Sequence, residues 1–195
     1  MKIFQKFVWR LFKKMKIIKK KFNDVFLINS KKFSDKRGYF SEIYNKKNFY
    51  KIINKNINFV QLNFAFSKAP TLRGLHFQKG KYAQGKLIKV LKGKIYDVVL
   101  NIDPKSKNFR KWAGFTLSEN KNNLLWVPKG YAHGYLTLTK NTEVQYLCDN
   151  YYKKTSERCI LWSDKTINIK WPKNIKFNIS DKDKKGNLFS SFKKF

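Results

Sequence analysis

Short segments in which apolar and polar residues alternate run through most of the chain, with glycine, proline and asparagine between them. Two such segments, residues 85–91 and 94–103, flank the dipeptide Lys92-Gly93, and this pattern predicts a β-hairpin. Further strands are predicted at residues 24–29, 39–44, 59–67, 112–117, 123–127, 134–139 and 143–150. Strands that recur about every ten residues, with glycine and proline between them, predict a β-sandwich or a β-barrel.

Helical signals are few and short. Residues 45–53 are predicted to form a helical turn or a short helix, and residues 35–38 a turn. The centre of the chain contains no long amphipathic pattern with a period near 3.6 residues. We therefore expect a mainly β fold with a few short helices.

The first fourteen residues differ from the rest of the chain. Apolar residues at helical spacing alternate there with lysine and arginine: Ile3, Phe4, Phe7, Val8, Leu11 and Phe12. One interpretation is a basic amphipathic helix that makes a weak contact with an anionic membrane surface. The other is a start assigned one methionine too early, since the only methionines are Met1 and Met15 and the folded pattern begins after Met15. The apolar core and the cleavage site typical of a signal peptide are both missing.

The remaining residues, 15–195, are expected to form a single domain. A chain of 195 residues with 42% hydrophobic residues is long enough to bury a substantial core. No segment approaches the ~20 apolar residues of a transmembrane helix. Cys148 and Cys159 form neither a CxxC pair nor a ligand cluster, so we expect buried thiols in a reducing, cytoplasmic compartment. A disulfide between them has no support in the sequence.

The net charge of +32 raises the hypothesis of a basic nucleic-acid-binding barrel. Only five of the 44 basic residues are arginines, and the lysines are spread along the whole chain. Abundant lysine, asparagine and isoleucine indicate an AT-rich coding bias, whereas a nucleic-acid site would gather its basic residues on one face. We therefore favour no nucleic-acid partner, although the field would attract an anionic, nucleotide-linked substrate.

The chain has only two histidines, and each lies in a dense motif. His76 lies within residues 71–78 and His133 within residues 127–135. Histidine is the side chain whose ordinary pKa suits proton transfer near neutral pH. A structural histidine in a core strand is the alternative for His76, and a tight turn at residues 130–134 the alternative for His133.

The spacing of Arg73 and His76 sets a geometric requirement. Residues three apart on a strand face opposite sides of the sheet. The two side chains can share a pocket only if a bulge or a turn intervenes, and Gly74 is suited to supply one.

The motif Pro128-x-Gly130-x-x-His133 resembles the second motif of the cupin β-barrels. Metal cupins have two more histidines and a carboxylate in a first motif, and here that region offers only His76. A three-histidine metal site is therefore excluded, which leaves a two-histidine, one-carboxylate site as the metal-binding alternative. We favour a metal-free, cupin-like double-stranded β-helix, also called a jelly-roll barrel.

Further motifs occur in order from about Met15 to Asp183, and together they resemble the dTDP-4-dehydrorhamnose 3,5-epimerase family. They include Asp35-x-Arg37-Gly38-x-Phe40-x-Glu42, Gln61-x-Asn63, Arg73-Gly-Leu-His-Phe-Gln78, Gln84-Gly-Lys86, Tyr96-Asp97, Val144-x-Tyr146, Tyr151-Tyr152, Glu157, Trp171-Pro172 and Ser180-Asp-Lys-Asp183. The order and spacing of the motifs make this resemblance specific.

The resemblance implies a cofactor-free epimerisation of dTDP-4-dehydro-6-deoxy-D-glucose at C3 and C5. The C4 ketone acidifies these two positions, so a base with a pKa near the working pH suits the first step. By resemblance His76 is that base and Tyr146 is the proton donor. A phenol is a weak acid, with a pKa of about 10. We therefore expect a positive charge beside Tyr146, which Lys86 would supply while stabilising the enolate oxygen.

The resemblance also implies a carboxylate partner for His76. Asp183 occupies the matching motif, and Asp164 in Leu161-Trp-Ser-Asp164 is the rival, since spacing alone does not choose between them. The alternatives for these catalytic candidates are ordinary ones: a strand aromatic for Tyr146, a solvated lysine for Lys86 and a solvated acid for Asp183.

Substrate contacts are implied for a larger group, and arginine's planar fork suits diphosphate oxygens. The group comprises Arg37, Glu42, Gln61, Asn63, Arg73, His133, Glu157 and Lys182, with Tyr152 stacked on thymine. In the family the segment from Asp35 to Glu42 reaches the neighbouring subunit's site, so a homodimer is implied.

One alternative within the fold stays open. A single-carbon epimerase or isomerase of another dTDP-4-keto-deoxysugar would share most of these motifs. The favoured reaction would supply dTDP-rhamnose for surface polysaccharide.

Overall fold

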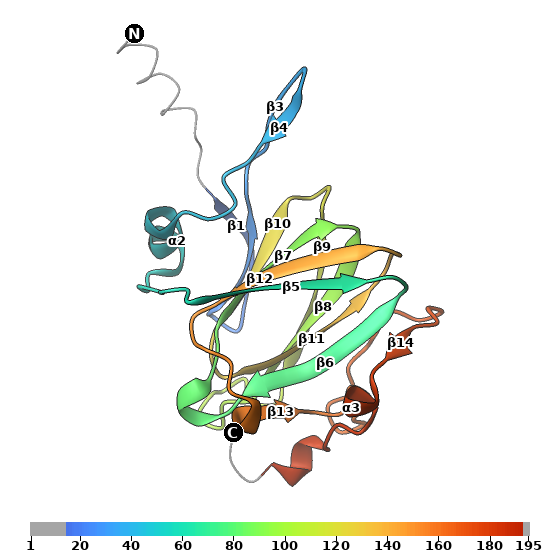
Figure 1. Cartoon of the computed structure of the whole chain (residues 1–195). Coiled ribbons are helices and arrows are strands. Elements are labelled where there is room, and N and C mark those ends of the chain that lie inside the picture. Colours follow the sequence, from blue (N-terminus) through green and yellow to red (C-terminus); the bar gives the residue numbers. More distant parts are fainter. Residues whose placement is uncertain (1–14, 193–195) are drawn as a thin grey trace.

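Two antiparallel β-sheets that pack face to face form the body of the protein in a computed structural model, which describes residues 15–192 (Figure 1). The amphipathic segment predicted at residues 1–14 lies outside the described residues. In order across the first sheet, the strands are β1 (Lys16–Lys21), β2 (Val25–Asn29), β10 (Asn123–Val127), β7 (Lys86–Lys92), β12 (Thr142–Cys148) and β5 (Gln61–Ser67).

The second sheet has the order β13 (Glu157–Cys159), β6 (Thr71–Gln78), β11 (Tyr131–Thr137), β8 (Lys94–Asn101) and β9 (Trp112–Ser118), and β14 (Asn178–Ile179) pairs in parallel with β6. From β5 to β8 each strand lies in the opposite sheet from the one before it, and from β10 to β13 the same alternation returns. This winding closes the two sheets into a jelly-roll barrel. The prediction of a mainly β, cupin-like fold is confirmed.

The helices are short, as expected. They are α2 (Lys46–Ile53), α3 (Asp181–Lys184) and the single 3₁₀ turns η1 (Gly80–Tyr82), η2 (Lys154–Ser156) and η3 (Phe189–Ser191). No helix among residues 15–192 has the length and apolar character needed to cross a membrane.

Successive side chains of a strand point to opposite faces of its sheet, so the buried apolar residues form three clusters, one inside the barrel and two outside it. In β8, Ile95 and Val99 belong to the cluster inside the barrel, while Val98 and Leu100 pack beneath the C-terminal segment with Phe189. A third cluster, which contains Phe49 and Trp126, fills the space between α2 and the outer face of the first sheet. Both faces of β8 are therefore buried, which explains its nearly continuous apolar sequence.

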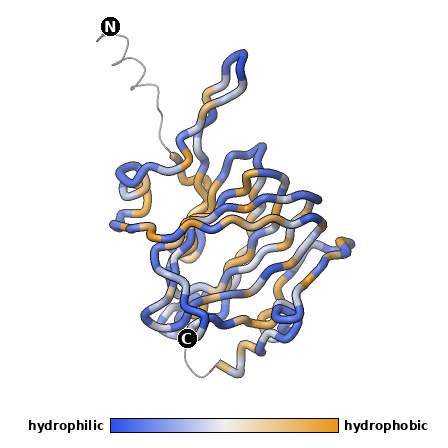
Figure 2. Tube along the Cα trace, in the orientation of Figure 1, coloured by the Kyte–Doolittle hydropathy of each residue, from blue (hydrophilic) through white to orange (hydrophobic). Residues whose placement is uncertain are grey.

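A separate hairpin, β3 (Phe33–Asp35) with β4 (Gly38–Phe40), extends away from the barrel (Figure 1). Figure 2 shows hydrophilic residues at its tip. The strand predicted at residues 39–44 is correct only to Phe40, where β4 ends. Glu42 accepts a hydrogen bond from the Asn48 side chain at 2.9 Å, and Asn45 caps α2, so this part of the chain turns into the helix instead of continuing the strand.

The tight turn considered for residues 130–134 is also not what the structure shows. Gly130 has a positive φ of 88°, but β11 begins at the next residue. His133 lies within the strand, between His76 of β6 and Val99 of β8. Pairing on both sides therefore holds the segment extended.

Candidate active site

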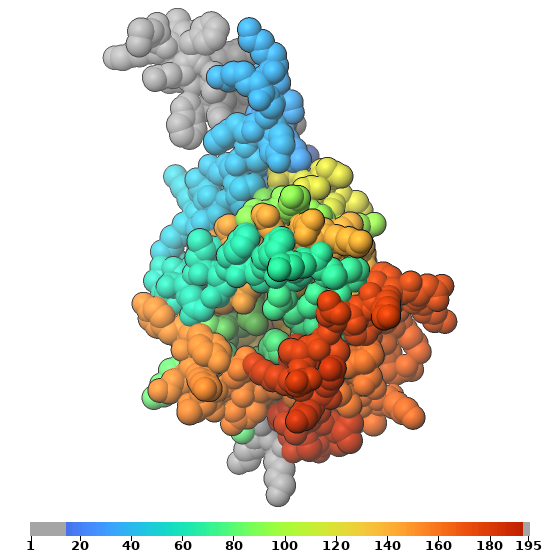
Figure 3. Space-filling model, turned by 45° about the vertical axis from the view of Figure 1, so that its right-hand side comes forward, coloured from blue at the N-terminus to red at the C-terminus, as the bar shows by residue number. Residues whose placement is uncertain are grey.

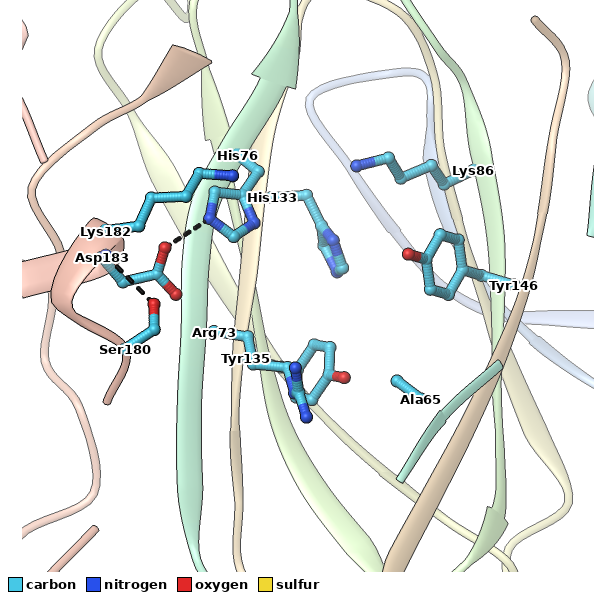
Figure 4. Close-up of a pocket in the computed structure, with 10 residues that line it drawn as sticks. All are labelled: Ala65, Arg73, His76, Lys86, His133, Tyr135, Tyr146, Ser180, Lys182 and Asp183. Carbon is cyan, nitrogen blue, oxygen red and sulfur yellow. Dashed lines mark hydrogen bonds and ion pairs between the residues drawn. The ribbon is translucent and has the colours of Figure 1, made fainter. Parts of the chain in front are cut away.

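A cavity of about 300 Å³ lies inside the barrel between the two sheets (Figure 4). Three parts of the fold supply its walls: the second sheet, the first sheet, and the segment around α3. Its lining residues are Arg73, His76, His133 and Tyr135, then Ala65, Lys86 and Tyr146, and lastly Ser180, Lys182 and Asp183. A second cavity of about 370 Å³ shares His76, Lys86, Tyr146 and Lys182 with the first, so the two are continuous.

A bulge in β6 places Arg73 and His76 on the same side of the strand. His76 pairs with His133 of β11, and Arg73 pairs with Tyr135. The two residues of β6 are three positions apart in sequence, whereas their partners on β11 are only two positions apart. Gly74 lies in this irregular stretch with a φ of +114°, and a Cβ there would meet His133 O and Gly134 Cα at 2.7 Å. The bulge required by the sequence spacing is therefore present, and Gly74 is the residue that permits it.

His76 and Asp183 form a hydrogen-bonded pair on one wall of the cavity. His76 Nε2 lies 2.6 Å from Asp183 Oδ1, and Asp183 Oδ2 accepts the Gly74 N–H at 3.1 Å. Burial works to raise the pKa of Asp183, but the hydrogen bond and charge of His76 outweigh burial and hold that pKa below its ordinary value. When Asp183 is ionised, it accepts the hydrogen bond of the N–H group at His76 Nε2. In a neutral imidazole, Nδ1 of His76 is then the nitrogen without a proton. Figure 4 shows the second ring nitrogen of His76 on the cavity side.

The rival carboxylate, Asp164, has a different set of partners. It accepts hydrogen bonds from the Thr166 N–H and hydroxyl at 2.8 and 2.7 Å and from the Phe189 N–H at 2.7 Å. These contacts fold the loop after Leu161 and tie it to η3. Asp183, not Asp164, is thus the carboxylate that contacts His76.

His133 forms a second histidine–carboxylate pair deeper in the barrel. Its Nε2 lies 2.9 Å from both oxygens of Asp97, and both side chains are buried. Burial raises the pKa of Asp97, while the charge and hydrogen bond of His133 act against that rise. Asp97 of β8 therefore holds the ring of His133, which lines the cavity (Figure 4).

Tyr146 lies on the wall opposite His76, because β12 and β6 belong to different sheets (Figure 4). Burial raises the pKa of Tyr146, and the charge of Arg73 acts against that rise. Lys86 Nζ lies 6.0 Å from the centre of the Tyr146 ring, and removal from water lowers the pKa of Lys86. Lys86 therefore lies beside Tyr146, as expected, and Arg73 contributes a second positive charge near it.

Glu157 links two segments at the second cavity. Its Oε2 accepts from Lys182 Nζ at 2.6 Å and from the Tyr152 hydroxyl at 3.0 Å. Burial favours the neutral acid, but Lys182 and Tyr152 together hold the pKa of Glu157 below its ordinary value. Gln61 accepts the Tyr152 N–H at 2.9 Å and donates to Asn63 at 2.9 Å, so these predicted contact residues form one connected wall.

Arg37 and Glu42 are the two predicted contact residues that line neither cavity. Arg37 is exposed on the projecting hairpin and pairs with Asp35 at 2.6 Å. Glu42 accepts from the side chains of Asn45 and Asn48 near the base of that hairpin. Within one chain, neither side chain is brought to the cavity.

The sequence reasoning missed several residues of the site. Tyr135 lies two positions after His133 on β11, so strand alternation alone places it on the same wall. Asp97 belongs to a quoted motif, but only the pairing of β8 with β11 shows that it holds His133. Ala65 and Ser180 complete the lining. Cys148 and Cys159 are both free and buried, as expected.

Comparison with known proteins gives a consistent result. The family model described as dTDP-4-dehydrorhamnose 3,5-epimerase matches residues 19–191. The enzyme of that name from Shigella flexneri is 43% identical over 175 residues, which are 90% of this chain and 96% of that protein. The corresponding enzyme of Escherichia coli is 41% identical over 88% of this chain and 92% of its own length.

Solved structures show the same similarity. The Bacillus anthracis dTDP-4-dehydrorhamnose 3,5-epimerase, with TDP and PPi bound, superposes with a TM-score of 0.85 at 42% identity and covers 89% of this chain and 99% of that one. A dTDP-6-deoxy-D-glucose-3,5-epimerase from Legionella pneumophila, in complex with dTDP-4-keto-L-rhamnose, gives 0.87 at 35% identity over 91% of this chain and 94% of that one.

Proposed function

The chain belongs to the dTDP-4-dehydrorhamnose 3,5-epimerase family, and we propose that its barrel cavity performs the reaction with His76 as base and Tyr146 as acid. The enzyme converts dTDP-4-dehydro-6-deoxy-D-glucose into dTDP-4-dehydro-L-rhamnose by inverting C3 and C5. This reaction serves dTDP-rhamnose synthesis. The observation that carries the mechanism is the His76–Asp183 pair on one wall with the Tyr146 hydroxyl on the wall opposite.

His76 removes the proton in the first step. The neighbouring C4 ketone makes the protons at C3 and C5 acidic, because the resulting negative charge is delocalised onto the ketone oxygen. Asp183 orients the imidazole and stabilises the positive charge that forms on it when the proton is taken. The ketone stores the electron pair, so this route needs no cofactor.

Tyr146 returns a proton from the opposite face. Inversion requires that the new C–H bond form on the side away from the base. The raised pKa of Tyr146 keeps its hydroxyl protonated at neutral pH, as a donor requires. After transfer, the positive charge of Arg73 stabilises the phenolate until Tyr146 regains a proton from solvent, and His76 releases to solvent the proton that it took.

Lys86 stabilises the enolate between these two steps. Its ammonium lies in both cavities and beside the Tyr146 ring. Burial lowers the pKa of Lys86, and a developing enolate oxygen favours its charged form again. Lys86 therefore interacts more strongly with the enolate than with the neutral ketone, which is the property that accelerates a reaction.

The nucleotide part of the substrate binds in the second cavity. This cavity opens from the catalytic residues and is lined by Gln61, Asn63, Tyr152 and Glu157. Tyr152 is 48% exposed, so a flat face is available for the thymine ring to stack on. Lys182 and Arg73 add positive charge for the diphosphate.

The active form is a homodimer in which the β3–β4 hairpin delivers Arg37 and Glu42 to the partner subunit's site. The hairpin projects from the barrel and neither side chain lines its own cavity. Edge strand β5 also carries exposed apolar residues on its outer face: Leu62, Phe64 and Phe66 are 58%, 60% and 44% exposed. Figure 3 shows this strand lying open on the surface, in teal. An apolar row of this kind favours burial against a second copy.

A mixing experiment tests the exchange of hairpins. Chains carrying His76→Ala and chains carrying Arg37→Ala are co-expressed with different tags, and the mixed dimers are isolated. One site of each mixed dimer then has both His76 and Arg37, so activity returns toward half that of the wild type. Activity no higher than that of either parent variant would show that the hairpin does not serve the partner.

The proposed location is the cytoplasm. Both cysteines are free and buried, which agrees with a reducing compartment. The membrane-surface contact and the domain boundary at residue 15 remain predictions.

The mechanism is tested by exchange in deuterated water. Wild-type enzyme is expected to place deuterium at both C3 and C5, whereas a single-carbon epimerase would label one position. His76→Ala should retain substrate binding and lose exchange at both carbons. Normal turnover by this variant would refute the role of His76.

A further inference from the structure

A thiol lies behind the His76–Asp183 pair. Cys159, the last residue of β13, stands opposite His76 in the register of β13 and β6. Its Sγ donates to Asp183 Oδ1 at 3.7 Å, and the same oxygen lies 2.6 Å from His76 Nε2. One nitrogen, one sulfur and one oxygen thus converge, with all their ligand atoms within 4.8 Å of one another. No other trio of His, Cys, Asp or Glu among residues 15–192 meets this criterion.

We propose that these three side chains bind a thiophilic divalent cation such as Zn²⁺ or Cd²⁺, and that the bound ion inhibits the enzyme. Nitrogen, thiolate and carboxylate are the ligands that zinc uses in proteins. The ion takes the place of the hydrogen bonds that now join the three groups. The inhibitory consequence rests on the proposed role of His76, whereas the binding site itself does not.

Binding of the ion displaces one proton from the site. The sulfur of Cys159 bonds to the ion and the thiol proton leaves to solvent. Asp183 contributes a carboxylate lone pair. His76 contributes the lone pair of Nε2, and its ring proton then resides on Nδ1. The nitrogen on the cavity side is consequently protonated and has no lone pair with which to accept a proton from substrate.

Charge balance favours such an ion in this buried place. The Cys159 sulfur donates a hydrogen bond to Asp183, so it carries its proton before an ion binds. A divalent ion held by one thiolate, one carboxylate and a neutral imidazole makes a set with no net charge, the arrangement that a buried site tolerates best. The ammonium of Lys182, on the same helix as Asp183, is already paired with Glu157 at 2.6 Å.

Access comes from the cavity. The His76 side chain is 28% exposed and lines the cavity together with Asp183, whereas Cys159 is buried and lines neither cavity. The fourth position of a tetrahedral ion would face the cavity, where a solvent molecule would complete the set.

Titration with Cd²⁺ tests the site, because cadmium–thiolate bonds absorb in the ultraviolet. The full chain is freed of metal and titrated without substrate at about 0.15 M salt, which screens its positive field beyond about 8 Å. We expect one Cd²⁺ per chain, a thiolate absorption band, and release of about one proton per ion at pH 7. Loss of turnover should follow the same titration curve and be reversed by a chelator.

Two cysteine variants separate this site from any other thiol. Cys159→Ser should lose the absorption band and bind Cd²⁺ at least about 10-fold more weakly. Removing a residue that only supports a metal ligand already lowers metal affinity by about 10-fold or more, and Cys159 would be a ligand itself. Cys148→Ser is the matched control and should keep the band, because Cys148 is the other buried free thiol and contacts Asn63 instead. Proton release is measured on the wild-type chain, so the test stands even if Cys159→Ser does not fold.

Three results would overturn the proposal: no absorption band in the wild-type chain, no proton release on titration, or a band that persists in Cys159→Ser. Full turnover with Cd²⁺ bound at Cys159 would support the metal site and contradict His76 as the base. The two proposals can therefore fail separately.

Discussion

Replacing Asp183 with asparagine is the sharpest test of the catalytic pair, because the change keeps the shape of the side chain and removes its charge. In the wild-type chain Asp183 Oδ2 accepts the Gly74 N–H at 3.1 Å, while Oδ1 lies 2.6 Å from His76 Nε2. Asparagine has one oxygen and one NH₂ group. If the oxygen stays on Gly74, the NH₂ group faces Nε2.

That orientation disables the base. An NH₂ donor opposite Nε2 favours the imidazole tautomer with its proton on Nδ1, the nitrogen on the cavity side. The reversed amide would leave the buried Gly74 N–H facing another donor, which costs about 1–3 kcal/mol. Loss of general-base catalysis is expected to lower kcat by about 10²–10⁴-fold. This corresponds to about 3–5 kcal/mol in the activation barrier.

The assay measures kcat, KM and deuterium incorporation at C3 and C5. Asp181→Asn is the matched control, since Asp181 lies on the same helix but is exposed and pairs with Lys184 at 3.1 Å. We expect the control to behave like the wild type and KM of Asp183→Asn to change little. A folded Asp183→Asn enzyme whose kcat falls by much less than about 10²-fold would refute the assignment of Asp183 as the partner that orients the base.

Three further predictions concern the acid, the bulge and a buried lysine. Tyr146→Phe should keep deuterium exchange catalysed by the base but lose inversion, with epimerisation about 10²–10⁴-fold slower; equal loss of both activities would contradict separate roles. Gly74→Ala should destabilise the fold by at least about 1–3 kcal/mol in urea unfolding, because of its positive φ and the 2.7 Å approach of β11. Gly80→Ala has open space around it and should cost less, so an equal loss would argue against the close approach. Burial lowers the pKa of Lys89 from 10.5 to about 8. Between these two pH values the unfolded chain binds more protons at Lys89 than the folded chain does, so the free energy of unfolding rises with pH over this range. Lys89→Met should flatten that rise, and an unchanged pH profile would show that Lys89 is not its source.

The strands were largely predictable because each carries its own signal. The hairpin at residues 85–103 alternates clearly and became β7 and β8. The strand predicted at residues 39–44 failed after Phe40, because Glu42 and Asn45 bond to the start of α2. A local pattern of apolar residues does not reveal such competing hydrogen bonds.

The site was less predictable from spacing. The motifs singled out Asp183 by resemblance, yet Asp183 and Asp164 were equal candidates on distance along the chain. The contact between His76 and Asp183 joins residues 107 positions apart. The partner of His133 and the charge beside Tyr146 likewise depend on strands that meet only in the folded barrel.

The sequence by itself determined the mainly β fold, the family and the residue types that carry the chemistry, because alternation and motif order are properties of the chain. Only the tertiary structure decided that Asp183 holds His76, that Lys86 lies over the Tyr146 ring, and that Cys159 joins the catalytic pair. These choices follow from how the two sheets and the C-terminal helix pack together. Burial and distance in the folded state, which no local spacing encodes, fix which charges and protons interact.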